Sequence, residues 1–150
     1  MCITLYIMNI QQTLFRHRLL DIIRRNSLMY IISIILQCIL ILIFLTTGLL
    51  KITGNKQLVE TFQELNLPQW SRVVVGWVQI IGVAGLVIGF WNTGVAALAG
   101  IWLAINMVGG VATHMWAKDH ISKIIPALIL AILSILFGLI NLSDLLEIIL

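Results

Sequence analysis

The sequence predicts an all-α fold, an integral membrane four-helix bundle preceded by a short amphipathic N-terminal helix. Four apolar runs, each long enough to cross a hydrocarbon core roughly 30 Å thick, occupy about half of the 150 residues. Hydrophobic residues make up 61% of the chain and charged residues 10%, whereas soluble domains average about 25% charged. The first run has no charged side chain between Arg25 and Lys51. Lipid is therefore the expected solvent around most of the chain.

The bundle is expected to be one domain over residues 28–140. Its spans are expected at residues 28–50, 73–90, 95–113 and 124–140. The first span is longer than the apolar core of a signal peptide, which has about 7 to 15 residues, so we expect it to stay in place as a signal anchor.

Residues 1–27 are expected to form an N-terminal interfacial segment. From Leu14 to Arg25, apolar residues recur at helical spacing and four arginines surround the other face. This pattern is typical of a helix that lies on lipid head groups. The alternative is a tail upstream of the true start, since Met8 and Met29 are possible internal starts.

The segments between the spans are short. Within residues 54–72, Leu58, Phe62 and Leu65 recur at helical spacing, which predicts a short surface helix that ends before Pro68. Four residues separate the second and third spans, as expected for a tight antiparallel pair of helices. Residues 115–123 link the last two spans. Residues 141–150 are expected to be a C-terminal interfacial tail.

The net charge of +3 does not indicate a nucleic-acid partner, because the nine basic residues are scattered at the span edges. Four arginines lie on the side of the termini and five basic residues on the other side. The arginines are clustered before the first span, which usually dominates orientation. We therefore expect both termini on the cytoplasmic side.

Polar side chains inside a membrane need partners, and each span carries one near its midpoint. These four residues are Gln37, Gln79, Asn106 and Ser134, and Thr113 shares a helix face with Asn106. They form a candidate pocket for the head group of a small ligand. The alternative is a structural role, in which the amides join helices at about 0.6 to 2 kcal/mol each.

A second polar group is expected where the spans leave the membrane, at Lys51, His114, Asp119 and His120. A histidine there titrates near neutrality, so proton handling is one alternative to a hydrogen-bonded anchor. No second axial ligand for haem and no spaced zinc ligands accompany these histidines. We expect no metal and no cofactor.

The sequence lacks the residue sets that catalysis usually requires. It has no paired carboxylates within a span, no nucleophile with a neighbouring base and no glycine-rich phosphate loop. The protein is therefore not expected to catalyse a reaction by itself.

Several segments together resemble one family. They are Gly48–Lys51 with Gly54, Phe62–Pro68, Val75–Gln79, Gly109–His114 and Pro126–Leu128. Over roughly residues 40–140 the chain resembles the DoxX-like family of small four-span bacterial membrane proteins. The family often has a glutamate where this chain has Gln79, so a role that needs a buried acid is not expected here.

The resemblance implies a multi-pass protein of the bacterial cytoplasmic membrane. The family name derives from a membrane subunit of a thiosulfate:quinone oxidoreductase, and related proteins are associated with membrane redox complexes. The implied function is an accessory subunit of a redox or stress-response system, with membrane redox proteins as partners. The alternative is a small-ligand, lipid or quinone-binding protein that uses the polar pocket. A quinone-linked enzyme is the third possibility.

Overall fold

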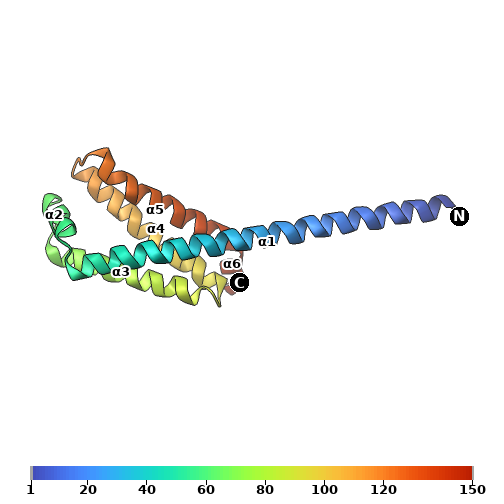
Figure 1. The fold of residues 1–150 in the computed structure, drawn as a ribbon, viewed down its shortest axis with the longest axis horizontal. Helices are drawn as coiled ribbons and strands as arrows, with labels where there is room; N and C mark the ends of the chain where they lie inside the picture. The colour runs from blue at the N-terminus through green and yellow to red at the C-terminus, as the bar shows by residue number, and fades with distance from the viewer. Residues whose placement is uncertain (1, 150) are drawn as a thin grey trace. The chain divides into compact units, whose positions relative to one another are not determined.

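The computed structural model describes the backbone of residues 2–149 and the side chains of residues 27–142 and 144–146. Its helices are α1 (Cys2–Thr53), α2 (Lys56–Glu64), α3 (Gln69–Ile88), α4 (Thr93–Trp116), α5 (Ile121–Ile140) and α6 (Leu142–Ile149) (Figure 1). The described residues contain no strand, which confirms the all-α prediction.

Four helical segments are long and apolar enough to cross a membrane, as predicted. They are Ser27–Thr53, Gln69–Ile88, Thr93–Trp116 and Ile121–Ile140. Most begin or end a few residues outside the predicted spans, because a helix continues through the polar residues that cap it whereas hydropathy detects the apolar stretch alone.

The chain divides into two compact units, residues 1–33 and residues 34–150. The backbone of residues 2–33 is helical, in agreement with the helix predicted from Leu14 to Arg25. The side chains of residues 2–26 lie outside the described part. The amphipathic face of this segment and its position on lipid therefore stay predictions.

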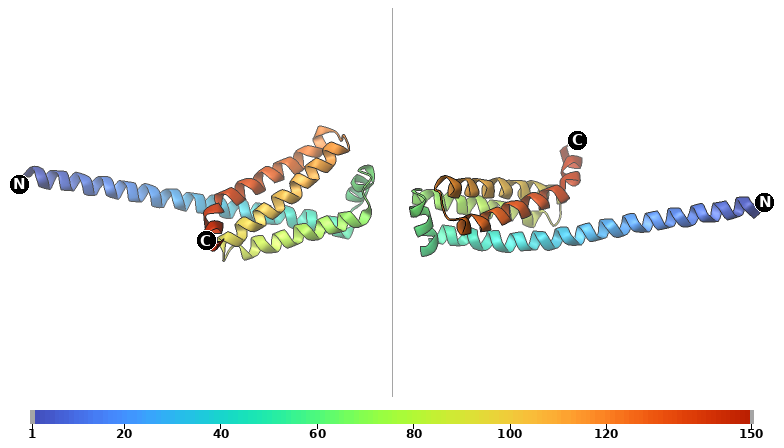
Figure 2. Two further views of the ribbon diagram at one scale, coloured as in Figure 1. Left: turned by 180° about the vertical axis from the view of Figure 1, so that it is seen from behind. Right: turned by 90° about the horizontal axis from the view of Figure 1, so that it is seen from above.

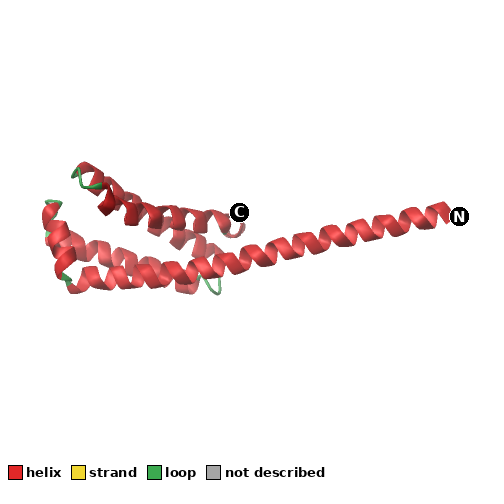
Figure 3. Ribbon diagram, turned by 45° about the horizontal axis from the view of Figure 1, so that its top comes forward, coloured by secondary structure: helices red, strands yellow, loops and turns green. Residues whose placement is uncertain are grey.

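The second unit is the bundle. In it α3 and α4 are neighbours joined by a short turn, and so are α4 and α5 (Figure 3). The views in Figures 1 and 2 agree that α2 lies across one end of the bundle, where α1 ends and α3 begins. The structure thus confirms the short helix predicted between the first two spans.

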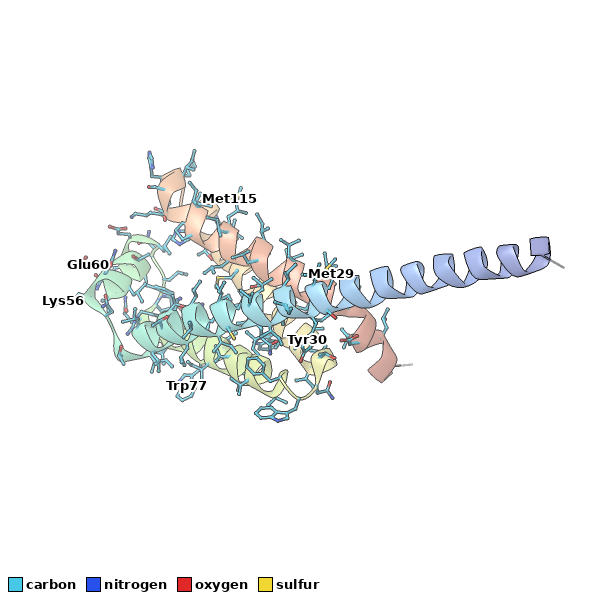
Figure 4. All side chains as sticks on the ribbon, turned by 45° about the vertical axis from the view of Figure 1, so that its right-hand side comes forward. Met29, Tyr30, Lys56, Glu60, Trp77 and Met115 are labelled. Carbon is cyan, nitrogen blue, oxygen red and sulfur yellow. The ribbon has the colours of Figure 1, made fainter. Side chains whose placement is uncertain are left out.

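The core of the bundle is small and made of side chains from all four spanning helices. Leu40 and Phe44 of α1, Leu86 of α3, Leu103 of α4 and Phe137 of α5 are fully buried. Most other large apolar side chains face outward, and Figure 4 shows Trp77 of α3 pointing away from the bundle. An apolar exterior around a small core is the arrangement that a lipid solvent permits.

Glycines set the distances between helices. A Cβ on Gly76 of α3 would lie 2.9 Å from the Gly48 carbonyl oxygen of α1. A Cβ on Gly85 of α3, or on Gly89 directly after it, would lie similarly close to Ala99 or Ala96 of α4. Small residues let helix backbones approach closely in a membrane, and here they do so inside the bundle.

The C-terminal residues are also helical. Helix α6 contacts α4, and Leu145 within it is 5% exposed. The preceding Asn141 is buried, and its side-chain Nδ2 donates to the Phe137 carbonyl oxygen at 2.9 Å. The predicted tail therefore folds against the bundle, and its relation to the lipid surface stays a prediction.

Candidate functional site

A cavity of about 500 Å³ lies at the end of the bundle that α2 crosses. Helices α1 to α5 all contribute to its wall. Its polar lining includes Lys51, Gln79, Asn106, Thr113 and His114. Its size falls within the range of roughly 300 to 1,000 Å³ that is usual for small-molecule sites.

The remainder of the wall is largely apolar. Leu58 and Phe62 come from the inward face of α2 and Leu65 from its C-cap, and Met107 and Leu130 come from α4 and α5. This face exists because the first three of these residues recur at helical spacing while Lys56 and Glu60 lie on the outer side of α2 (Figure 4). The cavity therefore suits a molecule with a polar head and an apolar body.

The polar part of the wall centres on a contact between α1 and α3. The Lys51 Nζ donates to Gln79 Oε1 at 3.1 Å, and Gln79 is 1% exposed. Arg72, also buried, donates through Nη1 to the Lys51 carbonyl oxygen and through Nε to Gln69 Oε1 at 3.1 Å. Two cationic side chains thus meet at the C-terminal end of α1, where the negative end of the helix dipole favours them.

Asn106 of α4 lines the cavity and has an unused hydrogen-bond acceptor. Its Oδ1 is buried and has no hydrogen-bond partner among the described residues. A buried polar group without a partner costs about 1 to 3 kcal/mol, so such groups call for an explanation. On the same helix, Cβ atoms added to Gly109 and Gly110 would have nothing within 4 Å. The backbone here opens onto free space, in which a ligand atom can lie.

His114 is held in place by a carboxylate. Its Nδ1 lies 2.7 Å from Asp119 Oδ2, and the two side chains are 17% and 16% exposed. Helix α4 ends in a left-handed turn at Lys118, and the Asp119 amide donates to the His114 carbonyl oxygen at 3.1 Å. This turn brings the carboxylate back beside the imidazole.

Lys123 of α5 also lines the cavity and makes an ion pair with Glu64 at the end of α2. The lysine side chain is 44% exposed and the glutamate side chain 57%. Exposed pairs contribute at most about 1 kcal/mol. The contact joins α2 to α5 at the edge of the cavity.

The predicted pocket residues divide into two groups. Gln79, Asn106 and Thr113 line the cavity, and the Thr113 hydroxyl donates to the Gly109 carbonyl oxygen at 2.6 Å. Gln37 and Ser134 are not among the lining residues.

Gln37 instead joins two helices, since its Nε2 donates to the Leu86 carbonyl oxygen of α3 at 2.6 Å. Gln37 is separated from Lys51, the partner of Gln79, by roughly 20 Å along α1 at about 1.5 Å per residue. The midpoints of the predicted spans therefore do not lie at the same depth in the bundle. Ser134 is fully buried, and its Oγ has no partner among the described residues.

The predicted interfacial residues also occupy different positions. Lys51 and His114 line the cavity, and Asp119 contacts His114. His120 caps α5, where its Nδ1 accepts from the Ser122 amide at 3.4 Å. Among the described side chains, no three histidine, cysteine, aspartate or glutamate residues are grouped as metal ligands would be.

Sequence reasoning missed the contribution of α2 to the wall and the role of Arg72. The spacing of Leu58, Phe62 and Leu65 could have indicated a face that packs onto the bundle end. The adjacent glycines Gly109 and Gly110 could have indicated a gap between helices. No sequence signal pairs Arg72 with the end of α1.

The fold and the cavity define a multi-pass α-helical membrane protein with a ligand-sized site at one end of its bundle. The chain belongs to the DoxX-like family, whose model matches residues 35–136. This confirms the resemblance found in the sequence and places the α1 to α5 bundle within the family match.

A relative in Bacillus subtilis (strain 168), named uncharacterized protein YdgD, is 30% identical over 106 residues. The similar region covers 70% of this chain and 93% of the relative. No solved structure matches the chain.

Proposed function

We propose that this protein binds a small amphiphilic ligand, such as a lipid or a quinone, in the cavity at the α2 end of the bundle. The observation that carries the proposal is the buried Oδ1 of Asn106, a residue that lines the cavity, because this oxygen has no hydrogen-bond partner among the described residues. Buried acceptors usually have a hydrogen-bond partner, and a structural role for the amides alone would leave this one without any. A hydrogen-bond donor on the ligand would give Asn106 Oδ1 the partner that it lacks.

The protein acts without catalysis of its own in this proposal. Ligand binding needs a shaped cavity and a few oriented polar groups, and both are present. Gln79, the residue at the polar centre of the wall, does not titrate. A quinone-linked reaction would need proton transfer, for which His114 with Asp119 is the available pair.

The second candidate function is that of an accessory subunit in a membrane redox or stress-response system. Membership of the DoxX-like family supports it, because the resemblance to this family implies such a role. The two functions are compatible, since a subunit can hold the ligand that its partner converts. Purification in a mild detergent should then recover a partner protein, and repeated isolation of the chain alone would count against this role.

We propose that the protein lies in the bacterial cytoplasmic membrane with both termini in the cytoplasm. The clustered arginines before the first span support this orientation. The cavity then opens toward the opposite face of the membrane. Its ligand would reach it from the outer leaflet or the space beyond.

The binding proposal is tested by native mass spectrometry of the protein released from mild detergent. Wild type should retain a small molecule, and Gln79→Leu should lose it while staying folded. Gln37→Leu is the matched control, because it removes a buried amide that lies outside the cavity lining. It should keep the ligand and lower stability by about 0.6 to 2 kcal/mol.

Two outcomes would count against binding. One is wild-type protein that carries no ligand from any mild detergent. The other is a Gln79→Leu variant that loses stability as Gln37→Leu does and shows no change in ligand content, which would assign Gln79 a purely structural role.

A further inference from the structure

The charge of the cavity wall identifies the kind of head group that it accepts. Resting on the proposed ligand site, we infer that the ligand is a single-chain amphiphile whose head carries one negative charge and a hydroxyl. Lys51 is its counter-ion, and Asn106 accepts from its hydroxyl.

Three basic side chains line the cavity, and two of them have carboxylate partners. His114 contacts Asp119, and Lys123 contacts Glu64. Lys51 has neither, because its Nζ hydrogen-bonds to the neutral Gln79 and no described carboxylate lies within salt-bridge distance of it. The wall therefore has one uncompensated positive charge when Lys51 is protonated.

The helix end does not supply the missing negative charge. The C-terminal carbonyls of α1 carry a partial negative charge that can stabilise one nearby cation. Arg72 already donates to the Lys51 carbonyl oxygen at this end, and it too lacks a carboxylate partner among the described side chains. Two cations lie beside a helix terminus that carries only about half a negative charge, so an anionic head group in the cavity would be attracted to Lys51.

Lys51 could instead extend to phosphates at the membrane surface, as lysines near helix ends often do. Its contact argues against this. The Nζ lies 3.1 Å from an amide oxygen of Gln79, which is 1% exposed, so the ammonium is turned toward the interior. An ammonium has three donors, and this contact uses one. The remaining donors are available to a ligand oxygen.

The rest of the wall determines the body of the ligand. Leu58, Phe62 and Leu130 present apolar surface to a cavity of about 500 Å³. A molecule of drug-like size fills such a space. Lys51 offers a hydrogen-bond donor and Asn106 an unpartnered acceptor, Oδ1. A ligand head group complements both residues when it carries an anionic oxygen for Lys51 and an N–H or O–H for Asn106.

The test measures binding of matched twelve-carbon probes to the purified full-length protein in a neutral detergent. The probes are dodecanoate, methyl dodecanoate, dodecylammonium and alpha-hydroxydodecanoate. Dodecanoate should bind at least about tenfold more tightly than the ester or the ammonium, as charge-assisted hydrogen bonds do over neutral ones. The hydroxy acid should bind a further roughly fivefold more tightly.

Variants assign the effect to residues. Lys51→Met should remove the preference for acid over ester, whereas Lys56→Met, which alters an exposed lysine on the outer side of α2, should keep it. Asn106→Ala should remove the gain from the hydroxyl alone. If Lys51→Met does not fold, Lys51→Gln replaces it, and the wild-type probe series decides the charge preference without any variant.

The outcomes separate this inference from the proposed function. Equal binding of acid, ester and ammonium overturns the anionic ligand but leaves a ligand site. A preference for acid that survives Lys51→Met overturns the role of Lys51. If no probe binds, the acidic amphiphile is excluded, and the ligand content of the purified protein still decides whether the cavity has an occupant.

Discussion

At the scale of single residues, the contact between Lys51 and Gln79 determines the chemistry of the cavity. An amide oxygen accepts from the lysine without cancelling its charge. A glutamate at this position would form an ion pair with Lys51 and neutralise the wall. The amide of Gln79 therefore leaves the charge of Lys51 free to attract an anion.

The close contacts of Gly76 allow a prediction about stability at this scale. A Cβ at Gly76 would meet the Gly48 carbonyl oxygen at 2.9 Å and Ile52 Cγ1 at 2.8 Å, so α1 and α3 would have to separate. Overpacking of this kind typically costs about 1 to 3 kcal/mol. We expect Gly76→Ala to lower the free energy of unfolding in detergent micelles by about that amount relative to the control.

The control is Gly109→Ala, since a Cβ there has nothing within 4 Å. Both substitutions gain the same helix propensity, about 1 kcal/mol. Equal free energies of unfolding of the two variants would contradict the close approach of α1 and α3 at Gly76.

At the scale of elements, left-handed residues end three helices around the cavity. Gly54, Asn66 and Lys118 have φ of 77°, 54° and 55°. Each is followed by an amide that donates back to a carbonyl five residues earlier, to Leu50, Phe62 and His114 respectively. These turns allow short connections, so that α2 lies across the bundle end and Asp119 reaches His114.

Lys118 adopts this conformation with a Cβ, which is unfavourable by about 1 kcal/mol or more. Lys118→Gly is therefore expected to raise the free energy of unfolding by about 1 kcal/mol, measured by chemical unfolding in micelles. Lys118→Ala removes the same charge and keeps a Cβ, so it should bring no such gain. Equal effects of glycine and alanine would contradict the left-handed turn.

At the scale of the whole molecule, the two ends of the bundle differ in structure. One end carries the cavity, α2 and the turn at Lys118. The other carries the turn at Trp91, whose side chain is 83% exposed. With four spans these two turns lie on opposite faces of the membrane.

Cysteine accessibility in intact cells tests the orientation. Cysteines are placed singly at Lys118 and Trp91 after replacement of Cys2 and the exposed Cys38. If the termini are cytoplasmic, a membrane-impermeant maleimide should label position 118 in whole cells and position 91 only after lysis. The reverse pattern would place the termini outside and the cavity on the cytoplasmic face.

Most of the fold follows from local properties of the chain. Span length and hydropathy depend on neighbouring residues, so the four spans and the short helix between the first two could be predicted. Their ends could not be predicted as well, because caps such as Asn92, whose side chain accepts from the Gly94 amide at 3.1 Å, lie outside the apolar stretch. The amides inside the spans were also recognised from composition alone.

The partners of those amides depend on how the helices are offset and rotated against one another. Gln37 and Gln79 look equivalent in the sequence, yet one bonds a backbone carbonyl of α3 and the other holds Lys51 at the cavity. The offset arises from glycine contacts such as that of Gly76 with Gly48, which join residues distant in the chain. Hydropathy thus determines which segments enter the lipid, and packing between helices decides which polar groups meet there, because depth and rotation are properties of the pair of helices rather than of either one.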